Sequence, residues 1–147
     1  MYPLLLCHMH YHTALSTSAS SKVRPLHVHL FRQMDLRLHD NPSLCASIDA
    51  AQKSAAATGI VPVFCFDPRI FGNDALSEFG NLKCGPRRAQ FVLESVADLR
   101  ANLEKQGSGL VVAHGKPEDV LQALLQKIDP GPSKSFVPKI TCQMEVA

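Results

Sequence analysis

Short apolar runs alternate with segments of helical periodicity from residue 26 to the end of the chain. Four apolar runs predict buried strands, at residues 26–31, 60–66, 110–113 and 140–146. Three segments between them predict helices, at residues 42–57, 117–128 and from 86 to a stop at Gly107. Residues 129–138 contain three prolines and therefore predict a linker before the last strand.

Strands and helices that alternate in this way predict a parallel sheet with right-handed crossovers. Runs that are apolar throughout, such as residues 60–66, indicate strands covered by helices on both faces. The fold class is therefore α/β, with a doubly wound, Rossmann-like parallel sheet. This fold supports many functions and identifies none of them.

A cluster of charged residues follows the first predicted strand, and ligands bind at that end of the strands in open α/β sheets. The cluster consists of Arg32, Asp35, Arg37 and Asp40. It predicts either a ligand site or an internal ion-pair network that holds the loop, and the network is the favoured interpretation. Asn41 is expected to cap the following helix, since its side chain can accept a hydrogen bond from a free backbone N–H.

Composition narrows the class of protein. With 147 residues, 46% of them hydrophobic, the chain has the size and the apolar content of one globular domain. The net charge of +2 is too small to indicate a nucleic-acid surface. Five scattered cysteines without a Cys-x-x-Cys pair predict neither a zinc site nor a disulfide framework, and no apolar run has the length of a membrane span.

Residues 1–25 differ in composition from the rest, because they lack Asp and Glu and are rich in Ser. This composition is typical of an organelle transit peptide and equally of a disordered N-terminus. We therefore expect a domain at residues 26–147 behind a transit-peptide-like or disordered segment. Import would place the protein in a chloroplast or mitochondrion, and otherwise the cytoplasm or nucleus is expected.

The common catalytic and phosphate-binding motifs do not occur in the sequence. It contains no Gly-x-Gly-x-x-Gly after the first strand, no P-loop and no Gly-x-Ser-x-Gly nucleophile elbow. Arg88, next to Arg87 at the start of the longest helix, could bind an anion or be a solvated side chain. The solvated side chain is the favoured interpretation.

Four motifs in order along the chain resemble the N-terminal α/β domain of the DNA photolyase/cryptochrome family, nearest to its cryptochrome DASH branch. They lie at residues 31–44, 62–69, 85–103 and 107–121, and they include Arg32, Asn41, Asp67 and Arg88. In one respect the chain departs from the family pattern. Gln33 and Met34 separate Arg32 from Asp35 where the family has a single residue, so we expect a bulge or a re-aimed Asp35.

The resemblance implies a sheet order of 3-2-1-4 and a domain that holds a light-harvesting antenna. The implied antenna is a folate, methenyltetrahydrofolate, and Glu145 aligns with the family's antenna segment. FAD, the electron-transfer tryptophans and the DNA groove belong to a following helical domain. The chain has no Trp, so we expect no catalytic residue in it, no FAD binding and no DNA repair by it alone.

The same comparison indicates that the α/β domain is C-terminally truncated, because the family's sheet has a fifth strand. An open strand edge and an uncovered domain surface would favour self-association. Three alternatives remain: an independent α/β module of nucleotide-binding type, an interaction fragment that docks on a full-length cryptochrome, and an incomplete gene model.

Overall fold

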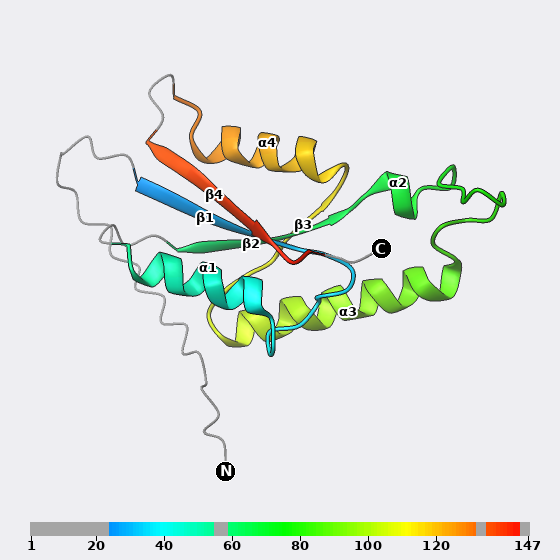
Figure 1. Cartoon of the computed structure of the whole chain (residues 1–147), viewed down its shortest axis with the longest axis horizontal. Helices are drawn as coiled ribbons and strands as arrows, with labels where there is room; N and C mark the ends of the chain where they lie inside the picture. Colours follow the sequence, from blue (N-terminus) through cyan, green and yellow to red (C-terminus); the bar gives the residue numbers. More distant parts are fainter. Residues whose placement is uncertain (1–23, 55–58, 132–134, 145–147) are drawn as a thin grey trace, which may run out of the picture.

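The computed structural model describes residues 24–54, 59–131 and 135–144 (Figure 1). In chain order the elements are β1 (Arg24–Phe31), α1 (Pro42–Gln52), β2 (Ile60–Phe66), α2 (Pro68–Phe71), α3 (Pro86–Lys105), β3 (Val111–His114), α4 (Pro117–Ile128) and β4 (Phe136–Cys142). The N-terminal segment before residue 24 and Glu145 lie outside the described residues.

The four strands form one sheet in the order β3-β2-β1-β4, and each neighbouring pair is parallel. This confirms the predicted α/β fold class and the strand order. Strands β1 and β2 occupy the centre of the sheet, where Val28 and Val63 are completely buried. Strands β3 and β4 are the two edges among the described residues.

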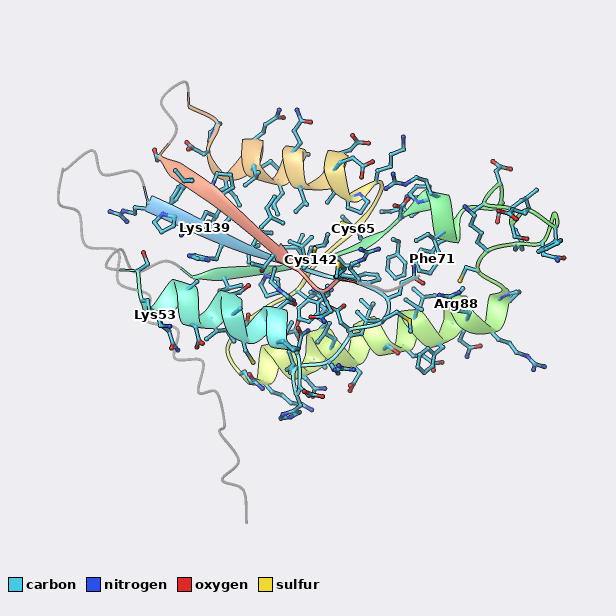
Figure 2. All side chains as sticks on the ribbon, in the orientation of Figure 1. Lys53, Cys65, Phe71, Arg88, Lys139 and Cys142 are labelled. Carbon is cyan, nitrogen blue, oxygen red and sulfur yellow. The ribbon has the colours of Figure 1, made fainter. Side chains whose placement is uncertain are left out.

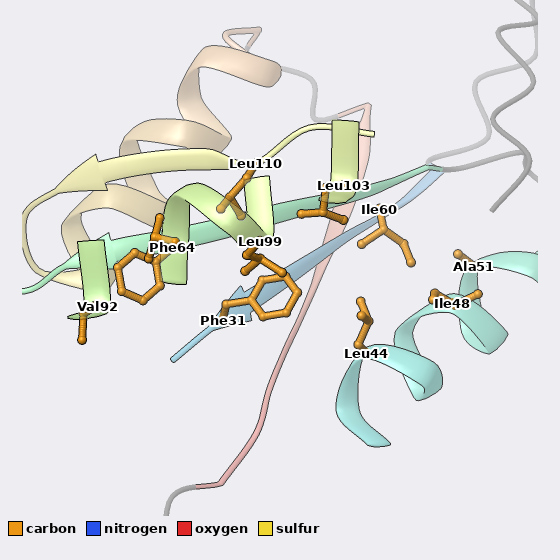
Figure 3. Close-up of a cluster of buried hydrophobic side chains, with 11 residues drawn as sticks. Phe31, Leu44, Ile48, Ala51, Ile60, Phe64, Val92, Leu99, Leu103 and Leu110 are labelled. Carbon is orange, nitrogen blue, oxygen red and sulfur yellow. The ribbon is translucent and has the colours of Figure 1, made fainter. Parts of the chain in front are cut away.

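Helices cover both faces of the sheet, as a doubly wound fold requires. Figure 1 shows α1 and α3 on one side and α4 on the other. The larger core joins α1 and α3 to the sheet and includes Phe31, Leu44, Phe64 and Leu103 (Figure 3). On the other face α4 contributes Leu121, which packs with residues of β1 and β2.

The last strand starts four residues earlier than predicted. Residues 136–138 belong to β4 rather than to a linker, and the strand ends at Cys142 rather than at 146. The N–H of Arg24 donates to the carbonyl of Ser135. Because the backbone groups of successive strand residues point to opposite sides, the N–H and C=O groups of residues 137, 139 and 141 also point toward β1. Pro138 therefore faces away from β1, on the side where no strand among the described residues pairs with β4, so its missing N–H costs no hydrogen bond in this sheet.

Other boundaries also differ from the predictions. Helix α1 ends at Gln52 rather than at 57. Its last hydrogen bond is the one that the N–H of Lys53 donates to the carbonyl of Asp49. Strand β1 starts at Arg24, and β3 covers residues 111–114. The short helix α2 was not predicted; its N-cap is Asp67, whose side chain accepts from the N–H of Arg69 at 2.8 Å.

The buried face of α3 provides a stability test. Leu103 is fully buried in the larger core, whereas Leu93 on the same helix is 56% exposed. Leu103→Ala should lower the free energy of unfolding by about 2–5 kcal/mol, because it leaves a cavity in a packed core. Leu93→Ala is the matched control and should change it by less than ~0.5 kcal/mol. Urea denaturation measures both, and equal effects would contradict the described core.

Candidate functional site

A pocket of about 260 Å³ lies at the carboxyl ends of β1, β2 and β4. The strand order reverses between β1 and β4, so the pocket is at the topological switch point where open α/β sheets bind ligands. The residues that line it are Leu30, Phe31, Arg32, Gln33, Phe64, Cys65, Asp67, Arg69, Ile70, Pro117 and Cys142.

The first wall is a tight turn after β1. The N–H of Asp35 donates to the carbonyl of Arg32 at 3.3 Å, and the carboxylate of Asp35 accepts from the N–H of Arg32. Gln33 and Met34 occupy the two central positions of this turn. The additional residue is thus absorbed by a turn, and Asp35 is buried beneath it.

Asn41 joins this turn to α1. Its Oδ1 accepts from the N–H of Leu44 at 3.1 Å, which makes it the N-cap that the sequence predicts. Its Nδ2 donates to the carbonyls of Asp35 and Arg37, both at 3.4 Å. One buried side-chain amide therefore caps a free N–H of the helix and holds the loop that precedes it.

The charged residues of the loop form hydrogen bonds with backbone groups of the same loop. The Nε of Arg37 donates to the backbone carbonyl of Asp40 at 3.1 Å. Asp40 has a φ of 52°, in the left-handed region that Asp tolerates better than most residues. The loop is thus held by contacts within itself, in keeping with a structural role for Arg37 and Asp40.

An ion-pair clamp forms the second wall. Arg69 donates through Nε to both carboxylate oxygens of Asp67, at 3.0 and 2.9 Å, and through Nη1 and Nη2 to Glu118, at 2.9 and 3.0 Å. The hydrogen bond from Arg69 is the main reason that the pKa of Asp67 lies below its ordinary value. The clamp ties the end of β2 to the first turn of α4.

Arg88 contacts the first wall from α3. Its Nη2 donates to Oε1 of Gln33 at 3.0 Å, so the residue that departs from the family pattern has a partner 55 positions away. Figure 2 shows Arg88 on the part of α3 that points toward Phe71 and the end of the sheet. No sequence signal indicated this contact, because both side chains are polar and far apart in the chain.

Two cysteines line the pocket, Cys65 on β2 and Cys142 at the end of β4. Burial raises the pKa of the Cys65 thiol to about 11, so this thiol is protonated near neutral pH. Within residues 24–54, 59–131 and 135–144, no group of three or more His, Cys, Asp or Glu side chains could hold a metal ion. None of the helices in those ranges is long and apolar enough to cross a membrane.

Three large apolar side chains are strongly exposed. Met34, Phe79 and Met144 are 72%, 88% and 83% exposed, more than any other large hydrophobic residue that the structure describes. Met34 follows β1, Phe79 lies in the loop between α2 and α3, and Met144 follows β4. Phe79 sits in a short hairpin closed by pairing of Leu76 with Leu82.

Comparison with known proteins identifies the family. The family model described as DNA photolyase matches residues 27–131. The chain belongs to the DNA photolyase family. The blue-light photoreceptor PHR2 of Arabidopsis thaliana is 45% identical over 111 residues, which cover 76% of this chain and 23% of the relative. Cryptochrome DASH of Gloeobacter violaceus is 45% identical over 95 residues, covering 65% of this chain and 17% of the relative.

A plant relative extends the comparison. The chloroplastic/mitochondrial cryptochrome DASH of Solanum lycopersicum is 38% identical over 112 residues, or 76% of this chain and 18% of the relative. The chain thus spans about a fifth of the length of the curated relatives it matches. The family resemblance drawn from the four motifs is confirmed, and the photolyase domain described above carries the pocket.

The two roles of Asn41 can be separated by substitution. Asn41→Ala removes the helix cap and both loop contacts, so it should lower the free energy of unfolding by about 2 kcal/mol. Asn41→Ser keeps an oxygen that can cap the helix, loses both loop contacts and should cost less. Asn73→Ala, at an exposed loop position, is the control. Thermal and urea unfolding measure all three; an Asn41→Ala effect no larger than the control would contradict the bridging role.

Proposed function

We propose that the chain is the antenna-chromophore-binding domain of a cryptochrome DASH-like photolyase and that its ligand is methenyltetrahydrofolate. The observation that carries the proposal is the pocket at the switch point of a sheet that belongs to the photolyase family. The ligand reaches the pocket from the open carboxyl edge.

The residues of the pocket suit one part of a folate. Leu30 and Ile70, which are both partly exposed, offer apolar surface to a ring system, and the amide of Gln33 offers hydrogen bonds. Arg32 supplies a cation for the carboxylates of the ligand's glutamate part. The volume of about 260 Å³ lies below the roughly 300–1,000 Å³ of pockets that enclose a whole small molecule, so the remainder lies along the rim. Glu145, three residues beyond Cys142, is the proposed contact there.

Blue-light photoreception or light-driven DNA repair is proposed for a longer protein of this family, in which the antenna passes excitation to FAD. FAD and DNA would bind to the helical domain of that protein, so residues 1–147 by themselves have no proposed catalytic residue. The exposed side chains of Met34, Phe79 and Met144 are proposed to meet that domain. Aromatic and Met side chains favour such interfaces, and without the domain they favour self-association.

For the cellular location we propose a chloroplast or mitochondrion. The composition of residues 1–25 supports import. Three plant relatives are named as chloroplastic/mitochondrial cryptochrome DASH proteins.

Binding of the folate tests the proposal directly. Methenyltetrahydrofolate titrated into the purified chain should show saturable binding by fluorescence at the chromophore's own absorption band. Arg32→Ala should weaken the binding by about tenfold or more, the value of one charge-assisted contact. Arg100→Ala, which removes an exposed guanidinium on α3, is the matched control and should leave the affinity unchanged.

Two outcomes would contradict the antenna assignment. One is equal affinity of the wild type and Arg32→Ala for the folate. The other is saturable binding of ATP with no binding of the folate, which would favour a nucleotide-binding module instead.

A further inference from the structure

The side-chain amide of Gln33 lines the pocket, and a residue of another element fixes its orientation. Nη2 of Arg88, on α3, donates to Oε1 of Gln33 at 3.0 Å. A guanidinium carries N–H donors and no acceptor, so the carbonyl oxygen of the amide is the atom that faces it. The positive charge of Arg88 also polarises the amide and makes its N–H groups stronger donors.

This contact leaves one half of the amide for a ligand. Among the described residues, no group accepts a hydrogen bond from Nε2 of Gln33. The side chain is partly exposed at the pocket, which gives Nε2 access to a bound molecule. A free Gln side chain can turn either end of its amide to a ligand, whereas this one offers N–H donors alone.

The backbone beneath this amide is held in place as well. Gln33 is the second residue of the turn in which the N–H of Asp35 donates to the carbonyl of Arg32 at 3.3 Å. The carboxylate of the buried Asp35 accepts from the N–H of Arg32, and Nδ2 of Asn41 donates to the carbonyl of Asp35 at 3.4 Å. The donor is therefore preorganised, and little conformational entropy is lost when a ligand accepts from it.

The second wall of the pocket offers no equivalent group. Both carboxylate oxygens of Asp67 accept from Nε of Arg69, and the guanidinium also donates to both oxygens of Glu118. These three charged groups satisfy one another, so the clamp shapes the pocket without selecting a donor or an acceptor on the ligand. Arg32 is assigned above to the carboxylates of the folate, which leaves the Gln33 amide to read the ring.

We propose that Gln33 is a specificity-determining residue, which donates through Nε2 to a carbonyl oxygen on the ring of the ligand, and that Arg88 is the positioning residue that holds it in this orientation. The inference rests on the proposed function, because it concerns the pteridine ring of the folate. That ring carries a single oxygen, the carbonyl at position 4, which accepts from an N–H. An amino group at the same position would place a donor against a donor, and the pocket should discriminate against it.

Folic acid and aminopterin test this choice, because their rings differ in having a carbonyl or an amino group at position 4. Each is titrated into the purified 147-residue chain by calorimetry near neutral pH, where both rings are uncharged. The affinity for folic acid should be about three- to tenfold higher, the value of one hydrogen bond.

The outcomes of this titration separate the inference from the proposed function. Equal affinities, or tighter binding of aminopterin, overturn the inference and leave the folate assignment standing. Binding of neither compound also overturns the inference, and methenyltetrahydrofolate titrated in parallel then shows whether the proposed function fails with it.

Substitutions assign the preference to the two residues. Gln33→Glu replaces the donor by a carboxylate that still pairs with Arg88, so it should reverse the preference in favour of aminopterin. Arg88→Leu frees the amide to turn over and should bring the two affinities within about twofold of each other. Arg88→Lys keeps a cationic donor and should retain the preference.

Arg87→Leu is the matched control, because it removes the neighbouring exposed guanidinium and leaves Arg88 in place. It should keep the wild-type preference for folic acid. If Gln33→Glu or Arg88→Leu keeps that preference too, the proposal is wrong.

The wild type gives an independent readout should a variant fail to fold. The side-chain amide protons of Gln33, followed by NMR, should shift on addition of folic acid and exchange more slowly with water, because they enter a hydrogen bond. Aminopterin at equal occupancy should leave their exchange unchanged. Equal slowing by both compounds, or no slowing by bound folic acid, would overturn the role of Gln33.

Discussion

The parallel pairing of β1 with β2 on one side and β4 on the other is the constraint on which the rest of the structure depends. The register sets His27 opposite both Ile60 and Lys139, so the three strands end at one edge. Because β1 leaves the sheet there, the turn at Arg32, the N-cap Asp67 and the strand end at Cys142 meet around one pocket. A slip of one residue in either pairing would exchange the side chains that β1 presents to the two covered faces of the sheet.

Different kinds of contact hold the two sides of the pocket. On the β2 side the clamp of Asp67, Arg69 and Glu118 ties a central strand to α4 through paired, charge-assisted hydrogen bonds. On the β4 side the strand is held by its pairing with β1 and by the buried contact between His29 and Thr141. A ligand that enters between them therefore meets one wall held by charge-assisted hydrogen bonds and one held by strand pairing.

Local patterns in the sequence predict most of the helices and strands. The features that these patterns do not predict depend on contacts between residues that are distant in the chain. The apolar runs and the Asn41 cap suffice for the doubly wound sheet, because strand burial and helix capping are local properties. The start of β4 was predicted too late because Pro138 indicated a linker, and only the strand pairing reveals that the position of its missing N–H faces away from β1. The pairs Arg69–Glu118 and Arg88–Gln33 join residues 49 and 55 positions apart, and polar side chains carry no pattern that predicts such partners.

The central claim is that the carboxyl edge of the sheet is where this photolyase-family domain takes its ligand. Amide chemical-shift mapping of the isotope-labelled chain during addition of methenyltetrahydrofolate tests it most directly. The account predicts that the shifted amides cluster at Arg32, Gln33 and Arg69 and at the end of β4. Shifts confined to the apolar groove between α4 and β4, around Leu125 and Ile140, would contradict it.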